Sequence, residues 1–272
     1  QGLRAKDHKN AIKAVQETKG EVLCQLGVRS EELGVKEYEI CDARFYKCCG
    51  GVTEQFETCW EDTHFDYLVK VEDFPKERRV ETSLMKCEAL NKGERRNDLT
   101  TEEGARAWIL SSPEAFCNTS DKKILNQVLN DYDQETIDFY RWKVSYTTNQ
   151  LSELIRKKSG IDFGEILALE PLKRGVSGRI YELKIVGSKK TLIVGKELEI
   201  RKWLSESHLY SSAFIVEKEN DTFTLYGAGW GHGVGLCQIG AAVMAEKGYT
   251  YKEILAHYYP HTEIMKCAAL NN

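Results

Sequence analysis

The spacing of apolar residues divides this chain into helices and strands of ordinary length. Apolar residues that recur three or four positions apart, beside a capping residue or a glycine, predict helices. The expected helices lie at residues 10–18, 100–111, 121–130, 149–155, 195–204, 236–248 and 250–260. Thr100 with Glu103, and Thr250 with Glu253, have the capping-box spacing that starts a helix.

Other stretches alternate apolar and polar residues with a period of two, which predicts half-buried strands. These expected strands lie at residues 21–26, 39–46, 66–73, 136–146, 166–169, 179–186, 191–194, 213–216 and 222–226. Strands gather apart from helices rather than alternating strictly with them, which favours an α+β fold with a mixed, largely antiparallel sheet and flanking helices. The dense charges of residues 75–97 indicate a solvated surface segment, and residues 75–130 are expected to form a charged helical insertion or subdomain.

Residues 227–242, GAGWGHGVGLCQIGAA, hold six glycines around one tryptophan and one histidine. Glycine adopts positive φ without a Cβ clash, so this stretch predicts a tight loop that leads into a helix N-terminus. It lacks the Gly-Lys-Ser/Thr ending of a phosphate-binding loop. Two interpretations stay open: His232 serves a binding site, or the loop is only a turn in which Trp230 fills the core.

The composition excludes some classes of function. The chain has 42 acidic and 38 basic residues, and no basic patch indicates a nucleic-acid partner. No apolar run has the roughly 18 residues of a membrane-spanning helix, so no transmembrane segment is expected. Nine cysteines indicate either an oxidising compartment or several buried thiols.

Two further groups of residues have candidate chemistry. Cys48, Cys49, Cys59 and His64 could bind a metal, but adjacent cysteines ligate one ion poorly, so a disulfide or buried thiols are favoured and no metal is expected. Arg179 at the start of a strand could hold a carboxylate or sugar hydroxyls, or lie in solvent. Residues 257–262, HYYPHT, could line a sugar cleft or form the rim of the core.

Three blocks, taken in order, resemble one known family. Residues 227–264 resemble the C-terminal signature of the stage II sporulation protein D / amidase-enhancer family, with its Gly-Trp-Gly-His-Gly loop, its Gln and Gly-Ala helix start and its final Tyr-Tyr-Pro-x-Thr. The block FYKCCGGVTEQFETCWEDTHFDYLVKVED resembles the family's aromatic-x-x-x-Gly-Gly-x-Thr-Glu segment, and RGVSGRIYELKIVG resembles its Arg-Gly-x-Ser-Gly-Arg strand. Residues 75–130 are the least family-like part.

The resemblance implies one domain over residues 1–272 that acts on cell-wall peptidoglycan, in the periplasm or cell-wall space. In the sporulation branch of the family, a single Glu works as acid and then base in the lytic transglycosylase cleavage of denuded glycan. The block that holds this Glu is absent, so we expect the domain to be N-terminally incomplete and the catalytic Glu to lie upstream of Gln1. The zinc site of some members would lie in that block too, so no metal or cofactor is expected within this chain.

The same resemblance nominates residues that position sugar hydroxyls or order the loop. They are His232, Gln238, Ser177, Arg179, Gly50, Gly51, Thr53 and Tyr46. Among them, only His232 is expected to titrate near neutral pH. The implied partners are peptidoglycan glycan strands and an N-acetylmuramoyl-L-alanine amidase. The alternatives to an enzyme are a non-catalytic module that binds wall glycan or enhances an amidase, and a purely structural domain.

Overall fold

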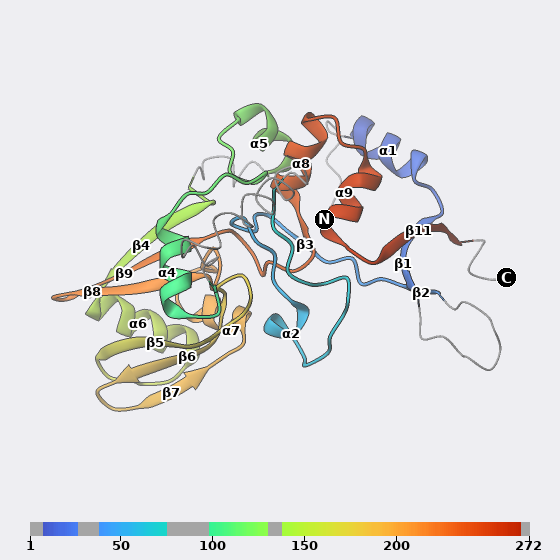
Figure 1. The fold of residues 1–272 in the computed structure, drawn as a ribbon. Helices are drawn as coiled ribbons and strands as arrows, with labels where there is room; N and C mark the ends of the chain where they lie inside the picture. The colour runs from blue at the N-terminus through green and yellow to red at the C-terminus, as the bar shows by residue number, and fades with distance from the viewer. Residues whose placement is uncertain (1–7, 27–37, 75–97, 130–137, 268–272) are drawn as a thin grey trace, which may run out of the picture. The chain divides into compact units, whose positions relative to one another are not determined.

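The computed structural model describes residues 8–26, 38–74, 98–129 and 138–267 (Figure 1). The chain forms two compact units, one made of residues 1–43 with 261–272 and the other of residues 44–260. The charged segment at 75–97 lies outside the described residues. The extent of the domain and the insertion at 75–130 therefore stay predictions.

The smaller unit is a three-stranded sheet with one helix. Helix α1 (His8–Glu17) precedes β1 (Glu21–Leu26), as the apolar pattern predicts. β1 lies between β11 (Thr262–Lys266) and β2 (Tyr38–Ile40), and both pairings are antiparallel. The strand predicted at 39–46 is wrong as a single element, because the chain leaves the sheet after Ile40 and pairs again only at Phe45.

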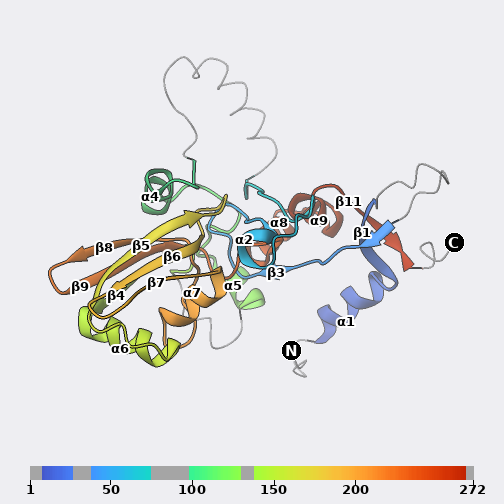
Figure 2. The ribbon, with the colours of Figure 1, turned by 90° about the horizontal axis from the view of Figure 1, so that it is seen from below.

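Two antiparallel sheets build the core of the larger unit. One has the order β4 (Arg141–Thr147), β9 (Thr222–Ala228), β8 (Phe214–Glu219), and the other has the order β5 (Ile166–Arg174), β6 (Ile180–Gly187), β7 (Thr191–Val194). Helix α6 (Thr148–Ser159) lies against strands of both sheets, and α7 (Glu197–Trp203) lies against β6 (Figures 1 and 2). Phe214, Phe223 and Leu183 belong to the single apolar cluster that these elements enclose.

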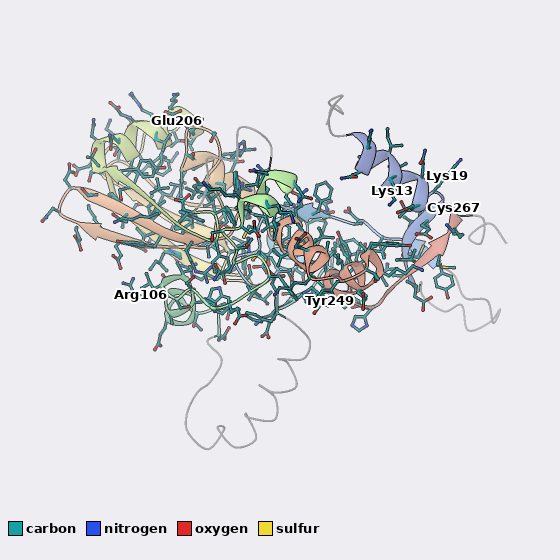
Figure 3. The ribbon with its side chains drawn as sticks, turned by 90° about the horizontal axis from the view of Figure 1, so that it is seen from above. Lys13, Lys19, Arg106, Glu206, Tyr249 and Cys267 are labelled. Atoms are coloured by element: carbon teal, nitrogen blue, oxygen red, sulfur yellow. The ribbon has the colours of Figure 1, made fainter. Side chains whose placement is uncertain are left out.

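Helix α4 (Glu102–Leu110) covers the outer face of the β4–β9–β8 sheet. Successive side chains of a strand point to opposite faces, so Phe214 packs into the main core while Ile215 packs against Ala105 and Ile109 of α4. Exposed ion pairs lie at the periphery of the unit, such as Lys157 with Glu206 at 2.9 Å (Figure 3 labels Glu206). The helix predicted at 100–111 is confirmed as α4, whose apolar residues pack on this sheet.

The remaining elements surround the glycine-rich loop. Helix α5 (Lys122–Val128) packs on α8 (Gln238–Glu246), which packs on α9 (Tyr251–Tyr258). β3 (Phe45–Tyr46) pairs in parallel with β10 (Leu236–Cys237), and α2 (Phe56–Cys59) follows β3. The strand predicted at 66–73 is wrong, since only Glu72 makes an isolated bridge, with Val52. With α and β elements and nearly all strand pairs antiparallel, the predicted α+β class is confirmed.

Candidate functional site

The glycine-rich loop, residues 229–235, is held along its length by residues 44–54. Trp230 N donates to Cys48 O at 2.7 Å, and Cys48 N donates to Trp230 O at 3.0 Å. Glu54 N donates to Gly233 O at 2.7 Å. These backbone groups of the loop are thus paired with protein.

Alternate glycines let the loop follow this path. Gly229, Gly231, Gly233 and Gly235 have φ values of 77°, 106°, 89° and 80°, which other residues rarely adopt. A Cβ on Gly233 would lie 2.4 Å from Cζ of Arg179. The positive φ values predicted from the glycine pattern are confirmed, and at Gly233 the missing side chain also gives room to a guanidinium.

His232 is fixed in one tautomer by the loop itself. Its Nδ1 accepts a 3.1 Å hydrogen bond from Val234 N, so its Nε2 carries the hydrogen and donates to Phe45 O at 3.1 Å. Its ring packs beside Tyr46 and Trp60, with centroids 5.2 and 4.9 Å away.

These surroundings correct the expectation that His232 titrates near neutral pH. Burial, and then the charges of Arg179 and Arg201, lower the pKa of His232 to about 3. The imidazole is therefore neutral at pH 7 and holds the loop through two hydrogen bonds. This arrangement suits a supporting role, which is the role expected from the family resemblance.

Behind the loop lies a buried network that centres on Glu54, a residue that the sequence analysis did not nominate. Its carboxylate accepts hydrogen bonds from Ser177 Oγ at 2.6 Å, Ser177 N at 3.1 Å and Val176 N at 3.0 Å. Gln55 N and Thr58 Oγ1 donate to the same carboxylate at 2.9 and 3.2 Å. Burial raises the pKa of Glu54, while these hydrogen bonds oppose the shift.

Arg179 connects this network to the loop. Its Nη1 donates to Ser177 Oγ at 2.8 Å, and its Nε donates to Gly231 O at 3.2 Å. The whole Arg179 side chain is buried, with 0% of its surface exposed. Of the two roles predicted for Ser177 and Arg179, burial favours ordering the loop, and direct contact with a ligand stays a prediction.

The other nominated residues lie beside the same loop. Gly50 faces Gly229 so closely that a Cβ on Gly50 would lie 2.9 Å from Gly229 N. Buried Thr53 donates to Val69 O at 2.8 Å and accepts from Val71 N at 2.6 Å, so its hydroxyl replaces part of the regular backbone pairing that a strand at 66–73 would make. Gly51 follows Gly50 in the same turn, and half-buried Gln238 is the first residue of α8.

Aromatic and cationic side chains surround the loop on its accessible side. Phe45 is 57% exposed, and Trp60, Tyr210 and Trp230 are half-buried. We call these four residues the aromatic rim. The Arg44 guanidinium lies 3.9 Å from the centre of the Trp60 ring, and Lys47 Nζ lies 4.0 Å from that of Trp230. Since Trp230 is half-buried, it does not simply fill the core.

A cavity of about 590 Å³ lies on the far side of the Glu54 network. It is lined by α2 residues such as Glu57 and Thr58, by Gly175 and Val176, and by Lys196. Lys196 Nζ donates to Glu57 O at 2.7 Å and to Asp62 Oδ1 at 2.9 Å, so its charge is committed to the protein. The backbone of Gly175 and Val176 separates this cavity from the Glu54 carboxylate.

One protein family covers most of the chain and a large part of this site. The sequence model of the family described as "Domain of unknown function (DUF8618)" matches residues 54–235 of the 272-residue chain. The chain belongs to this family. The DUF8618 match begins at Glu54 and includes Ser177, Arg179 and His232, so it contains the network that orders the loop.

Two similar proteins are known from Bacillus subtilis (strain 168). The amidase enhancer is 38% identical over 77 residues, which are 28% of this chain and 11% of that protein. Stage II sporulation protein D is 38% identical over 81 residues, 30% of this chain and 24% of that protein. The stage II sporulation protein D of Bacillus amyloliquefaciens is 38% identical over 73 residues, 27% of this chain and 21% of that protein.

These similarities confirm the resemblance that the three sequence blocks indicate. The matched stretches span less than a quarter of the length of the curated relatives. Among the described helices, none has the length and apolar character needed to cross a bilayer.

Proposed function

We propose that this chain binds the glycan strands of peptidoglycan outside the cytoplasm, through the aromatic rim around the ordered loop. The observation that carries the proposal is that a loop held by hydrogen bonds, with a neutral His232, lies beside one exposed and three half-buried aromatic residues. Aromatic rings stack on the apolar C–H faces of pyranose sugars, while neighbouring polar groups orient the hydroxyls. The similarity to proteins named stage II sporulation protein D and amidase enhancer supports a wall polymer as the ligand.

The proposal extends to chemistry only for the intact protein. There we propose lytic transglycosylase cleavage of denuded glycan, with a Glu that is supplied from outside residues 1–272. Glu54 does not fit the role of this acid, because five donors already bind its carboxylate and the turn at 175–177 covers it. The described loop would hold the sugar while another segment transfers the proton.

Co-sedimentation with glycan strands tests the binding. We expect the chain to sediment with denuded strands, and Trp60→Ala or Trp230→Ala to weaken binding about tenfold, which corresponds to about 1.4 kcal/mol. Tyr251→Ala is the matched control, because Tyr251 is an aromatic residue on α9 with 42% of its surface exposed. Equal binding by all four proteins would contradict the proposed surface.

Product analysis separates binding from cleavage. We expect no anhydro-muramic ends after incubation of denuded glycan with residues 1–272 alone. Such ends, absent with a heat-denatured sample, would show that an acid within this chain does the chemistry. The name of the amidase enhancer favours a second function, in which the chain accelerates a wall amidase. A higher amidase rate in the presence of this chain, without glycan cleavage, would support that function.

A further inference from the structure

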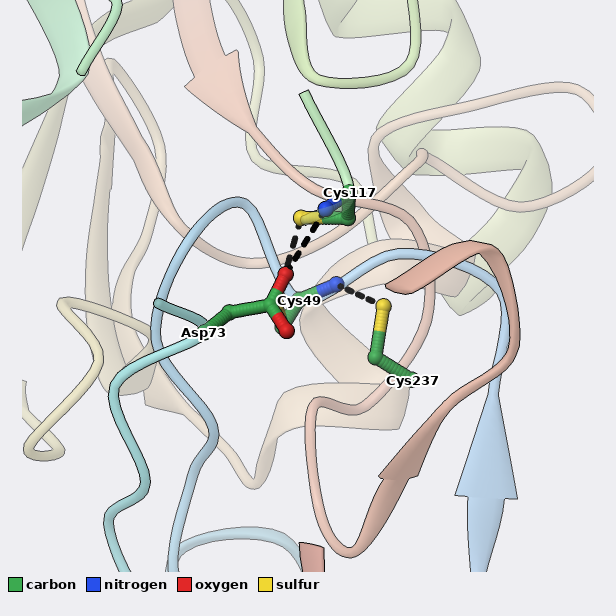
Figure 4. Close-up of side chains that lie close together, drawn as sticks. All are labelled: Cys49, Asp73, Cys117 and Cys237. Atoms are coloured by element: carbon green, nitrogen blue, oxygen red, sulfur yellow. Dashed lines mark hydrogen bonds between the residues drawn. The ribbon is translucent and has the colours of Figure 1, made fainter. Parts of the chain in front are cut away.

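Four metal-binding side chains meet in the interior of the larger unit. Cys49, Asp73, Cys117 and Cys237 are all buried, and their Sγ and carboxylate oxygen atoms lie within 4.8 Å of one another (Figure 4). They come from four separate segments: the turn after β3, the residue after the Glu72 bridge, the loop between α4 and α5, and the N-cap of α8. Such convergence brings together side chains that the sequence places far apart.

The spacing of the sulfur atoms fits a metal better than a covalent bond. Cys49 Sγ lies 3.3 Å from Cys117 Sγ, and both thiols are free. Sulfur atoms on a tetrahedral zinc ion lie about 3.8 Å apart, which follows from Zn–S bonds of about 2.3 Å. The distances in the cluster, from 3.3 Å to at most 4.8 Å, bracket that value.

Backbone N–H groups point at the sulfur atoms in a way that favours thiolates. Gly51 N donates to Cys49 Sγ at 3.3 Å, and Cys237 Sγ accepts from Cys49 N at 3.3 Å and from Gly240 N at 3.4 Å. Cys237 also lies at the positive end of helix α8. A thiol needs none of these donors, whereas a metal-bound thiolate is stabilised by each of them.

The carboxylate of Asp73 is oriented just as firmly. Its Oδ1 accepts from the Tyr258 hydroxyl at 2.6 Å, and its Oδ2 accepts from Cys117 N at 2.8 Å. Asp73 O in turn accepts from Phe116 N at 2.8 Å. The Cys117 side chain also contacts this carboxylate, and Tyr258 provides the second layer of contacts that fixes a metal ligand.

We propose that Cys49, Asp73, Cys117 and Cys237 bind one Zn²⁺ as a closed structural site. Three thiolates and one carboxylate select zinc over magnesium and calcium, which prefer all-oxygen ligands. Four protein ligands leave no open position, so the ion stabilises the fold and does no chemistry. On binding, each thiol releases its proton to solvent, and no oxidant or reductant takes part.

The proposed site differs from the metal site that the sequence analysis weighed. The interpretation that no metal binds here rested on the adjacent pair Cys48 and Cys49, but only Cys49 of that pair belongs to the cluster. Cys59 and His64, the other two residues weighed for that site, are not part of it.

The ion would lock both sides of the candidate functional site. Cys49 immediately precedes the Gly50–Gly51 turn, and Cys237 lies two residues after Gly235, the last residue of the loop. The Arg179 guanidinium that holds the loop also reaches Cys49 O, at 3.5 Å. Loss of the metal should therefore loosen the loop as well as lower the melting temperature of the protein.

Metal analysis of the whole chain tests the proposal. The protein is purified without chelator and its zinc content is measured by mass spectrometry. We expect one zinc per chain, and we expect Co²⁺ substitution to give the thiolate charge-transfer and tetrahedral d–d absorption of a sulfur-rich site. The proposal would be overturned by a wild-type protein that folds without metal and does not bind added Zn²⁺. A Cys49–Cys117 disulfide found by peptide mapping would overturn it too.

Variants assign the ligands. Cys49→Ser, Cys117→Ser and Cys237→Ser should lose most of the zinc, and Cys59→Ser is the matched control because it removes a buried thiol outside the cluster. Tyr258→Phe keeps the packing and removes only the hydrogen bond to Asp73, so zinc affinity in chelator competition should fall by about 10- to 100-fold. Zinc content lost equally in Cys59→Ser, or affinity unchanged in Tyr258→Phe, would contradict the assigned ligands.

Discussion

The hydroxyl of Ser177 donates a 2.6 Å hydrogen bond to the carboxylate of Glu54, a residue 123 positions away in the chain. Both residues are buried. Ser177 Oγ also accepts a hydrogen bond from Arg179, which in turn donates to Gly231 O in the glycine-rich loop. The loop therefore depends on a carboxylate that never reaches the surface. A substitution of Glu54 should therefore disturb the loop as well as the residues that contact Glu54 directly.

Glu54→Gln tests how much the network stabilises the protein. The amide NH₂ of Gln would replace one of the two carboxylate oxygens, so it would face either Val176 N and Gln55 N or Ser177 N, all of which need an acceptor. Buried donors left without an acceptor cost about 1–3 kcal/mol, so we expect the free energy of unfolding to fall by about 2–3 kcal/mol in urea titrations.

Glu182→Gln is the matched control for this change. Glu182 makes an exposed ion pair with Lys173 at 2.7 Å, and such pairs contribute about 0–1 kcal/mol. If both variants unfold at the same urea concentration, the Glu54 network does not stabilise the fold as described.

Gly233→Ala tests the close approach of the loop to Arg179. The new Cβ would lie 2.4 Å from Arg179 Cζ, at a φ of 89° that alanine also resists. Gly160→Ala has the same kind of positive φ, 73°, but its Cβ would meet nothing within 4 Å. We expect Gly160→Ala to cost about 1–2 kcal/mol and Gly233→Ala at least about 2 kcal/mol more, by thermal or urea unfolding. If the two variants lose the same free energy of unfolding, backbone strain alone explains why position 233 is a glycine.

The lowered pKa of His232 predicts a pH dependence of stability. In the unfolded chain this imidazole takes up a proton below about pH 6.5, whereas in the folded protein its pKa is about 3. The unfolded state therefore binds more protons between these values, and the free energy of unfolding falls as the pH falls through this window. Because the side chain is only partly buried, we expect a loss on the order of 1–2 kcal/mol by pH 4.5.

Carboxylates also titrate in this window, so the prediction concerns a difference between proteins. His232→Gln should have a shallower pH dependence between pH 6.5 and 4.5 than the wild type, since this one proton is gone. His208→Gln, which removes an exposed histidine, is the matched control. Parallel curves for the wild type and His232→Gln would contradict the assigned environment.

The cap of helix α4 shows where local sequence signals reach their limit. The capping-box spacing nominates Thr100, but Thr101 is the N-cap, and its hydroxyl accepts from Gly104 N at 3.1 Å. Thr101→Ala should lower the free energy of unfolding by about 1 kcal/mol. Thr100 instead donates to Asp98 Oδ1 at 2.7 Å in an exposed turn, so Thr100→Ala should cost less. Calorimetry of the two variants distinguishes the two caps.

Features that depend on nearby residues were predictable from the sequence, and features that depend on distant ones were not. The alternate glycines of the loop and the Thr250 cap of α9 follow from local rules of backbone geometry. The alternation at 66–73 is equally clear, yet the hydroxyl of Thr53 takes the backbone contact that a strand partner would have made. Glu54 is one of 42 acidic residues, and only the fold brings Ser177 to it.

The cysteines show the same limit in another form. Cys48 and Cys49 are conspicuous in the sequence because they are adjacent. The four side chains that converge in the structure come instead from positions 49, 73, 117 and 237. Metal sites can be read from a sequence when their ligands share a short motif. No such motif joins these residues, so the cluster becomes visible only when the elements around the loop are placed in space.

Arg179→Lys tests whether order in the loop matters for glycan binding. The planar guanidinium contacts Ser177 Oγ and Gly231 O together, and a lysine ammonium cannot reach both in the same geometry. We expect Arg179→Lys to weaken co-sedimentation with denuded glycan at a temperature where circular dichroism shows the variant folded. Arg156→Lys, on the exposed last turn of α6, is the matched control and should bind as the wild type does. A folded Arg179→Lys protein with wild-type binding, but a lower melting temperature, would mean that Arg179 supports the fold without positioning the binding surface.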